Sequence, residues 1–339
     1  MKLSTAASLI TSGTSSLMLK LLKTSNEFYR ASFVSAAISG GVYAAFDNGR
    51  ATIEQLCTRL NNITNKDGLR AWLDLGVSLG ELKRSGQEYR IVGKLSRALL
   101  DPANDAYQAM LEEIVRHHYG YVLDTPAKLR RHEWFPFDEE PGQLVARSSR
   151  ISEPFIFEAI DDAVPREGAF DLLEVGCGSG TYIRYACGRN PDLRAIGLEL
   201  QEKVSEVARK NMREWGLEGC ATIEHHDVRT YTAGRQFDLV TFHQNIYYFS
   251  PGERVALAQQ VLGLLKPGGC VLLTTLGQGG GPAGQAVGIW VATTKGYGAL
   301  PDPDELCGQL REAGFADVKK KRLIPLESFW AFVGTKPKA

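Results

Sequence analysis

The sequence predicts an α/β protein in which a doubly wound parallel sheet follows a helical N-terminal domain. From residue 170 onward, short runs rich in valine, leucine and phenylalanine alternate with helical patterns, as in parallel sheets. The first hundred residues show helical patterns and few strand-like runs. The chain has 339 residues, 44% of them hydrophobic and 23% charged, which is typical of a globular protein of two domains.

The charge and cysteine content disfavour several classes of protein. The 39 Lys and Arg residues balance 39 Asp and Glu residues, so net charge gives no support to a nucleic-acid or membrane partner. Six cysteines lie far apart, without a Cys-x-x-Cys pair or a histidine cluster, which favours reduced thiols, no structural zinc and a cytoplasmic location. Serine and threonine interrupt the apolar residues at 1–10, so we expect no signal peptide and no membrane span.

Residues 1–100 are expected to form the first domain. Helical patterns cover 33–38, 53–60 and 69–79, and Thr52 is a good N-cap for the second of these helices. Residues 81–92 predict two short strands around a Ser-Gly turn. Three helices followed by a hairpin is the element order of a winged helix.

A winged helix raises DNA binding as an alternative. Lys and Arg outnumber Asp and Glu in residues 1–100. However, the helix at 69–79 offers a single basic side chain, Arg70, among apolar and acidic residues, whereas reading the major groove takes several side chains that reach base edges. We therefore expect this domain to dimerise rather than to bind nucleic acid.

The remaining chain divides into a helical, aromatic-rich segment at 101–165 and a β-α domain at 166–339. In a doubly wound sheet, ligands bind outside the carboxyl ends of the strands, so the strand ends are where site residues are sought. The pattern predicts strands at 171–175, 195–200, 221–225, 237–242 and 270–276, a closing pair at 316–323 and 329–335, and helices at 182–189, 203–215 and 252–265.

A glycine-rich turn follows the first strand of this domain. Glu174 is followed by Gly176, Gly178 and Gly180, and these glycines permit a tight turn that approaches a nucleoside closely. A dinucleotide fold has its third glycine one residue later, where helix amides meet a pyrophosphate. The carboxylate of Glu174 would repel a pyrophosphate and attract a cation. Both facts favour S-adenosylmethionine, a cationic nucleoside without phosphates.

Two further acidic residues lie at strand ends. Glu199 ends the second strand, where a carboxylate can accept hydrogen bonds from both ribose hydroxyls. Asp227 ends the third strand, and its carboxylate can accept from the amino group of an adenine while the amide of Val228 pairs with a ring nitrogen. Each acid alone is commonly a solvated strand end, but three at successive strand ends favour a nucleoside site.

These motifs resemble those of the class I S-adenosylmethionine-dependent methyltransferases, and more narrowly the small-molecule, O-methyltransferase-like enzymes with an N-terminal winged-helix dimerisation domain. The resemblance is most specific at 174–180, at 237–240 and at the turn 264–269. It implies a Rossmann-like seven-stranded sheet, a homodimer, and a small-molecule acceptor that the segment 101–165 helps to bind. It implies a cofactor site formed by Glu174, Gly176, Gly178, Gly180, Glu199, Leu200, Asp227, Val228 and His243.

The sequence departs from this family at one position. O-methylating members carry a His-Asp pair after the fourth strand, and the histidine deprotonates the acceptor. Tyr247 and Tyr248 stand at those positions here, and a tyrosine hydroxyl, with an ordinary pKa of about 10, is a poor base. Tyr247 is therefore a candidate catalytic residue that either deprotonates or orients the acceptor. His243 is the other candidate base, and capping the strand or lining the sulfur end of the cofactor is its alternative role.

Aromatic and histidine residues mark the expected acceptor pocket. We expect His118, Tyr119, Tyr248 and Trp290 to bind the acceptor, which favours a flat, largely apolar molecule. The paired histidines of the chain are adjacent in sequence and so face different directions, and no metal is expected. The glycine-rich stretch 277–281 either hinges a lid or forms a loose surface loop.

The sequence leaves two main hypotheses of function. The first is methyl transfer from S-adenosylmethionine to the oxygen or carbon of an aromatic, polyketide-like or enolic metabolite. The second is a cofactor-binding homodimer that has lost catalysis or acts as a regulator through its winged helix. An NAD-dependent oxidoreductase ranks third because of the glycine spacing.

Overall fold

The computed structural model describes residues 11–12, 14–136 and 142–338. The stretch 1–10, on which the expectation about a signal peptide depends, lies outside the described residues. No helix in the described part of the chain is both long enough and apolar enough to cross a bilayer.

The chain forms two compact units. The first comprises Met1–Gly120 and Pro141–Ile151, and the second comprises Tyr121–Glu140 and Ser152–Ala339. The helical segment expected at 101–165 is therefore divided between them.

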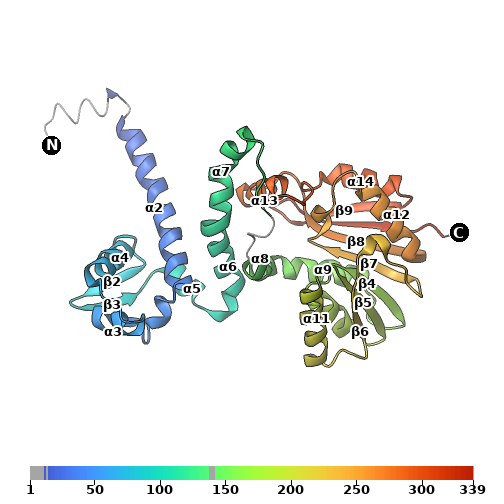
Figure 1. The fold of residues 1–339 in the computed structure, drawn as a ribbon, viewed down its shortest axis with the longest axis horizontal. Coiled ribbons are helices and arrows are strands. Elements are labelled where there is room, and N and C mark those ends of the chain that lie inside the picture. The colour runs from blue at the N-terminus through green and yellow to red at the C-terminus, as the bar shows by residue number, and fades with distance from the viewer. Residues whose placement is uncertain (1–10, 13, 137–141, 339) are drawn as a thin grey trace. The chain divides into compact units, whose positions relative to one another are not determined.

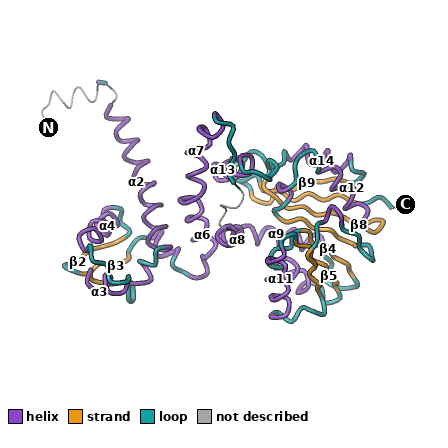
Figure 2. Tube along the Cα trace, viewed as in Figure 1, coloured by secondary structure: helices purple, strands orange, loops and turns teal. Residues whose placement is uncertain are grey.

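Helices and a small sheet build the first unit, as Figures 1 and 2 show. Its three strands form an antiparallel sheet in the order β1-β3-β2. The hairpin expected at 81–92 is confirmed, and β1 adds a third strand that was not predicted from the sequence. Its elements are α2 (Thr14–Ser39), β1 (Arg50–Thr52), α3 (Ile53–Arg59), α4 (Lys66–Ser78), β2 (Leu82–Ser85), β3 (Glu88–Ile91), α5 (Lys94–Leu99), α6 (Asp105–Glu113), the π-helical turn η3 (Ile114–His118) and α8 (Gly142–Ser148).

Local capping explains where the helices of this unit begin. The Thr52 side chain accepts from the Gln55 amide and the Gln55 side chain accepts from the Thr52 amide, a capping box at the start of α3. Asn65 caps α4 by accepting from the amide of Gly68. Phe33, Leu56, Leu73 and Tyr89 from four elements are buried in one core. This core gives the first unit its own apolar interior.

A seven-stranded sheet forms the centre of the second unit. Its order is β6-β5-β4-β7-β8-β10-β9, parallel except for β10, which runs antiparallel to both of its neighbours. The predicted strands and the closing pair are confirmed. The elements are α7 (Tyr119–Arg130), which begins in the first unit, then α9 (Glu153–Ala163), β4 (Phe170–Val175), α10 (Thr181–Arg189), β5 (Leu193–Glu199), α11 (Glu202–Glu214), β6 (Ala221–His225), η6 (Val228–Thr230), β7 (Phe237–His243), η7 (Ile246–Tyr248), α12 (Arg254–Leu264), β8 (Leu265–Leu276), α13 (Pro282–Thr293), α14 (Pro303–Glu312), β9 (Ala316–Ile324) and β10 (Phe329–Thr335).

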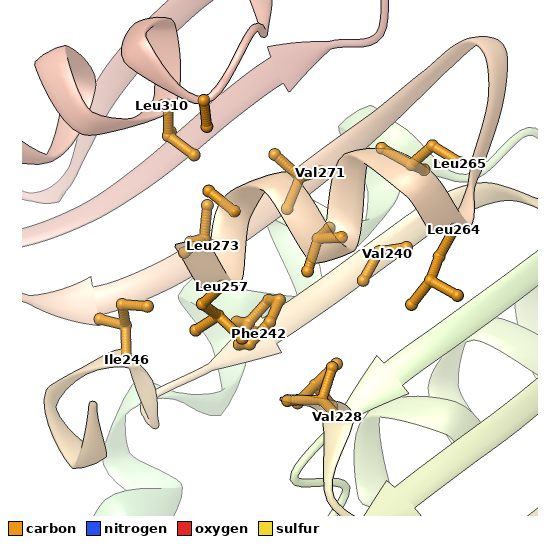
Figure 3. Packing of buried hydrophobic residues seen from close by; sticks show 14 of the residues in the cluster. Val228, Val240, Phe242, Ile246, Leu257, Leu264, Leu265, Val271, Leu273 and Leu310 are labelled. Atoms are coloured by element: carbon orange, nitrogen blue, oxygen red, sulfur yellow. The ribbon is translucent and has the colours of Figure 1, made fainter. Parts of the chain in front are cut away.

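Helices cover both faces of this sheet. On one face α9, α10 and α11 bury Ile156, Ile183 and Met212 against the strands. On the other face α12 and α14 bury Leu257 and Leu310, as Figure 3 shows. A sheet buried on both faces consists of near-continuous apolar strands, and the strand patterns in the sequence have this character.

Two of the six cysteines form a disulfide, which overturns the expectation that all thiols are reduced. Cys187 on α10 and Cys220 before β6 are joined, with Cα atoms 6.4 Å apart, within the usual range for a disulfide. The two residues are 33 positions apart in sequence, so no local spacing marks the pair. The disulfide removes the support that dispersed cysteines gave to a cytoplasmic location, which stays a prediction.

Candidate functional site

The turn between β4 and α10 is built from glycines in the left-handed backbone region. Gly176, Gly178 and Gly180 have φ values of 64°, 54° and 82°, which side chains other than glycine adopt at a cost. A Cβ atom on Gly176 would lie 2.5 Å from Nδ2 of Asn245. The turn therefore needs glycine both for its path and for the close approach of a neighbouring side chain.

The carboxylate of Glu199 lies beside this turn. One of its oxygens accepts from the amide of Gly178 at 3.1 Å and the other accepts from the amide of Gln201 at 3.0 Å. The residue is 8% exposed. A carboxylate oxygen has two lone pairs, so both oxygens keep capacity to accept from a further donor such as a ribose hydroxyl.

Glu174 is a fully buried acid at the end of β4. It is 1% exposed, and its Oε1 atom has no hydrogen-bond partner among the described residues. Burial, with a smaller contribution from the negative charge of Glu199, raises the pKa of Glu174 well above its usual range. Such a carboxyl holds a proton until a cation or a donor group is placed beside it.

His243 ends β7 in a buried position. It is 7% exposed, and Nδ1 lies 2.8 Å from Oγ1 of Thr274. Its ring packs against Tyr182 with the ring centroids 4.7 Å apart. Burial lowers the pKa of His243 to about 3, so the imidazole is neutral at pH 7 and accepts a proton weakly. This favours a binding or orienting role, and the assignment of His243 as a base stays a prediction.

The two residues after His243 form side-chain hydrogen bonds to segments distant in sequence, one of them just before the glycine turn. Gln244 has a φ of 54°, an uncommon conformation for a residue with a side chain, and its Nε2 atom donates to Oγ of Ser152 at 2.5 Å. Asn245 is 8% exposed and its Nδ2 atom donates to the carbonyl of Val175. Oδ1 of Asn245 is buried and has no hydrogen-bond partner among the described residues.

Asp227 lies at the start of η6 with Arg229. Nη2 of Arg229 lies 2.7 Å from a carboxylate oxygen of Asp227, and the Arg229 amide donates to the same carboxylate at 2.9 Å. These contacts lower the pKa of Asp227. Val228 is buried and Leu200 is 59% exposed. The roles of these residues toward an adenine stay predictions.

Four aromatic residues form a cluster beyond the end of β7. We define the aromatic cluster as Tyr247, Tyr248, Trp290 and Tyr297. Ring centroids are 5.1 Å apart for the two adjacent tyrosines, 4.9 Å for Tyr248 and Tyr297, and 5.4 Å for Trp290 and Tyr297. Trp290 and Tyr247 are buried and Tyr248 is 43% exposed. The structure therefore brings three of the predicted site residues together and adds Tyr297.

Arg254 holds the two chain segments that carry this cluster. Its guanidinium donates to the carbonyls of Phe249 and Ala299, and the Gly298 amide donates to the carbonyl of Tyr247 at 2.8 Å. Arg254 is 3% exposed, and burial lowers its pKa. Backbone carbonyls thus satisfy a buried guanidinium on α12.

The glycine-rich stretch at 277–281 is held on both sides, so the expectation of a loose loop is wrong. The Gly277 amide donates to the carbonyl of Ser328 at 2.7 Å and the Gln278 amide donates to the carbonyl of Pro301 at 2.9 Å. The Gly281 amide donates to the Glu327 carboxylate at 3.1 Å. The bonds to Ser328 and Glu327 join the stretch to the turn between β9 and β10, and the bond to Pro301 joins it to the segment before α14.

His118 and Tyr119 belong to the first unit. Nε2 of His118 lies 3.2 Å from Oε1 of Glu113, one π-helical turn earlier. Burial raises the pKa of Glu113, but hydrogen bonds from His118 and Ser148 outweigh it and place this pKa below its usual range. Tyr119 is 48% exposed and packs on Phe28. Their assignment to the acceptor stays a prediction.

The residues at the end of β4 fit a cationic nucleoside. One side-chain oxygen of Glu174 and one of Asn245 are buried, and no described residue donates a hydrogen bond to either. The ammonium group of S-adenosylmethionine is a hydrogen-bond donor that suits such oxygens. The carboxylate of Glu199 remains able to accept from a ribose. The described residues contain no group of three or more His, Cys, Asp or Glu side chains arranged to bind a metal.

Comparison with known proteins agrees with this chemistry. Residues 172–269 match the family described as a methyltransferase domain. Over these residues the chain is similar to methyltransferase domains. Release factor glutamine methyltransferase from Caulobacter vibrioides is 28% identical over 138 residues, and the match covers 34% of this chain and 48% of that protein. The chain spans about half the length of the curated relatives it matches.

Solved structures share the fold of nearly the whole chain. Mitomycin 7-O-methyltransferase MmcR has a TM-score of 0.79 at 16% identity, over 96% of this chain and 99% of that chain. Human N-acetylserotonin methyltransferase in complex with S-adenosylmethionine has a TM-score of 0.72 at 18% identity, over 95% of this chain and 98% of that chain. Methyltransferases of this family use S-adenosylmethionine as their cofactor.

Several residues of the candidate site were not predicted from the sequence. Asn245, Arg254 and Tyr297 have no motif of their own and gain their roles from neighbours far along the chain. Glu327 lies in a turn where an acidic residue is ordinarily solvated. Arg229 is the exception, since a basic residue two positions after a strand-end aspartate is a visible pattern.

Proposed function

We propose that this protein transfers a methyl group from S-adenosylmethionine to a small, flat acceptor of aromatic, polyketide-like or enolic character. The glycine turn with the carboxylate of Glu199 and the unpartnered oxygen of buried Glu174 is the observation that carries the cofactor assignment. When bound, the cofactor supplies a methyl group on a positively charged sulfur. The glycine turn, Glu199 and Asn245 bind and orient it.

The acceptor side of the proposal depends on the aromatic cluster. Tyr247 is buried at the position where O-methylating relatives carry a base, and the imidazole of His243 is held neutral by burial. In-line positioning of the reacting atoms can supply much of the acceleration of a methyl transfer. We therefore propose that Tyr247 orients an acceptor that arrives as an enolate or an acidic phenol, methylated at oxygen or carbon.

Calorimetric titration with S-adenosylmethionine, its demethylated product and NAD tests the cofactor. We expect the first two to bind and NAD not to bind. Labelled methyl transfer to a panel of acidic phenols and enolic compounds then tests the acceptor. For Tyr247→Phe we expect a fall in rate below about tenfold, because losing one hydrogen bond costs about 1 kcal/mol. A loss beyond about a thousandfold would make Tyr247 an essential acid or base and contradict the orienting role.

We also propose that the protein is a homodimer formed through α2. The N-terminal half of this helix exposes Leu17, Leu19, Leu21 and Leu22, each more than half exposed in the single chain, and a concentration of exposed apolar side chains is typical of a protein interface. Light scattering after size exclusion should give twice the mass of the chain. Leu19→Glu should shift the protein toward the monomer, and a monomeric wild type would contradict the proposal.

A further inference from the structure

The glycine-rich stretch before α13 leaves space for the carboxylate of Glu327. A Cβ atom on Gly281 would lie 2.7 Å from Oε1 of Glu327, and a Cβ atom on Gly284 would lie 3.0 Å from Oε2. A Cβ atom on Gly280 would lie 3.1 Å from the same Oε2 atom and 2.7 Å from the amide nitrogen of Ser328. The glycines therefore make room for Glu327, and the richness in glycine is explained by packing.

The carboxylate of Glu327 also completes the start of α13. The N-cap residue of this helix is Gly281, which has no side chain to cap with, and the first turn contains no acidic residue. Glu327 accepts from the Gly281 amide at 3.1 Å and brings a negative charge to the positive end of the helix. A residue 46 positions away thus does what a local cap does elsewhere.

The opposite end of α13 is fixed by different contacts. The Phe135 amide donates to the carbonyl of Thr293 at 2.9 Å, and the Lys295 amide donates to the carbonyl of Phe135 at 2.9 Å. Trp290 lies between the two ends and is 5% exposed, with its ring against Tyr297. The place of Trp290 in the aromatic cluster therefore depends on how both ends of the helix are held.

We propose that Glu327 is a positioning residue for the acceptor side: seated among Gly280, Gly281 and Gly284, it fixes the start of α13 and thereby the place of Trp290. This inference rests on the proposed function, because the aromatic cluster is taken as the acceptor side. Glu327 acts through the helix and touches neither cofactor nor acceptor. The sequence does not indicate this role, because Glu327 is there only an acidic residue in a turn.

Hydrogen exchange on the full chain with S-adenosylhomocysteine tests the contact between Glu327 and the start of α13. In Glu327→Ala the amides at the start of α13 should exchange at least tenfold faster than in wild type. Glu327→Gln should lie between the two, since its amide oxygen still accepts from Gly281 but carries no charge. Glu312→Ala, an exposed acid at the end of α14, is the matched control and should leave exchange unchanged. Equal exchange in Glu327→Ala and wild type would overturn the proposal.

A second measurement separates positioning from a merely structural role. The fluorescence of Trp290, obtained by difference from Trp290→Phe, should be quenched by 4-nitrophenol, an acidic phenol used as the aromatic probe. In Glu327→Ala the apparent dissociation constant for 4-nitrophenol should rise at least fivefold, with calorimetric affinity for S-adenosylhomocysteine within twofold of wild type. Equal weakening of both ligands, or no quenching of Trp290 in wild type, would overturn the positioning role.

A failure of the proposed function can be distinguished from a failure of the proposed contact between Glu327 and α13. A wild-type chain that binds no S-adenosylhomocysteine would overturn the proposed function and, with it, the acceptor role of Glu327. The exchange comparison, repeated without that ligand, reports on the contact between Glu327 and α13 by itself.

Discussion

Two glycine-rich stretches of the second unit have similar composition but different surroundings. Each follows a strand of the same sheet and leads into a helix, 176–180 into α10 and 277–281 into α13. In the first, glycines in the left-handed region turn the chain beside buried acids whose oxygens are left for a ligand. In the second, Gly279 and Gly280 are also left-handed, but the acid that the glycines make room for, Glu327, accepts from the Gly281 amide. Glycine content therefore does not distinguish a turn that binds a ligand from a turn that makes room for a side chain of the same protein.

The helices that follow these stretches are also held differently. The disulfide between Cys187 and Cys220 ties α10 to the start of β6. The carboxylate of Glu327 ties α13 to the turn between β9 and β10. The helix behind the proposed cofactor site thus has a covalent tie and the helix beside the aromatic cluster has a reversible one, which is consistent with a rigid cofactor site and an adjustable acceptor side.

The largest effect is expected from a side chain in the first stretch. Gly176→Ala adds a Cβ atom where Nδ2 of Asn245 lies 2.5 Å away, at a φ of 64°. Left-handed strain and the loss of a buried hydrogen bond should lower the free energy of unfolding by about 4 kcal/mol, measured by urea denaturation, and should abolish binding of S-adenosylhomocysteine.

Two control variants sharpen this prediction. Gly188→Ala, in α10 with no atom near the added Cβ, should leave stability unchanged or raise it slightly. Gly281→Ala should cost less than Gly176→Ala, because the obstacle there is the end of the Glu327 side chain. Equal losses for Gly176→Ala and Gly281→Ala would remove the distinction between the two stretches.

Loss of the covalent tie on α10 should have the next largest effect. Cys187→Ser opens a loop that spans 33 positions, which on loop-entropy grounds lowers the free energy of unfolding by about 3.7 kcal/mol. Chemical denaturation with and without dithiothreitol measures it. The reductant should destabilise wild type and leave the double variant Cys187→Ser, Cys220→Ser unaffected. Two free thiols at these positions in untreated protein would contradict the disulfide.

A smaller effect is expected for the carboxylate beside the first stretch. Glu199→Gln keeps an acceptor for the Gly178 amide but loses the charge and half of the accepting capacity. Calorimetry should show S-adenosylhomocysteine bound about 30-fold more weakly, since hydrogen bonds to charged groups are worth roughly 2 kcal/mol. Glu202→Gln, an exposed acid at the start of α11, is the control. Unchanged affinity in Glu199→Gln would place the nucleoside elsewhere.

The smallest effect concerns the buried acid. The pKa of Glu174 in the folded chain lies above its ordinary value of 4.5, so the folded state keeps a proton that the unfolded state loses, and stability falls as pH rises above about 4.5. Glu174→Gln should remove this part of the pH dependence and raise the free energy of unfolding at pH 7. It should also weaken the binding of S-adenosylmethionine.

Two results would contradict that account of Glu174. One is a variant that is less stable than wild type at pH 7, which would mean that the carboxylate is ionised and satisfied in the ligand-free chain. The other is unchanged affinity for S-adenosylmethionine. Glu312→Gln, which replaces an exposed acid, controls for the change in net charge.

The sheet and its glycine turn could be predicted because their signals are local. Apolar strands between helical patterns, the acid before Gly176 and the acid at Glu199 all lie within a few residues of the elements they define. The caps at Thr52 and Asn65 are of the same kind. The extra strand β1 was missed because three residues carry no periodic pattern.

The aromatic cluster was predicted less completely because its contacts are long-range. Tyr247, Tyr248 and Trp290 were expected there, but Tyr297 joins them from a segment without a motif. Arg254 and Glu327 act on residues 45 and 46 positions away. Such partners have no spacing that a periodic pattern or a short motif would contain.

The sequence by itself determined the order of strands and helices along the chain, the glycine turn and the acids that favour a cationic nucleoside, because backbone preference and apolar periodicity act between near neighbours. Only the tertiary structure decided that Cys187 meets Cys220, that His243 is buried and neutral, and that Glu327 fills the space beside the glycines before α13. Burial and proximity set those properties, and both arise when distant segments pack together.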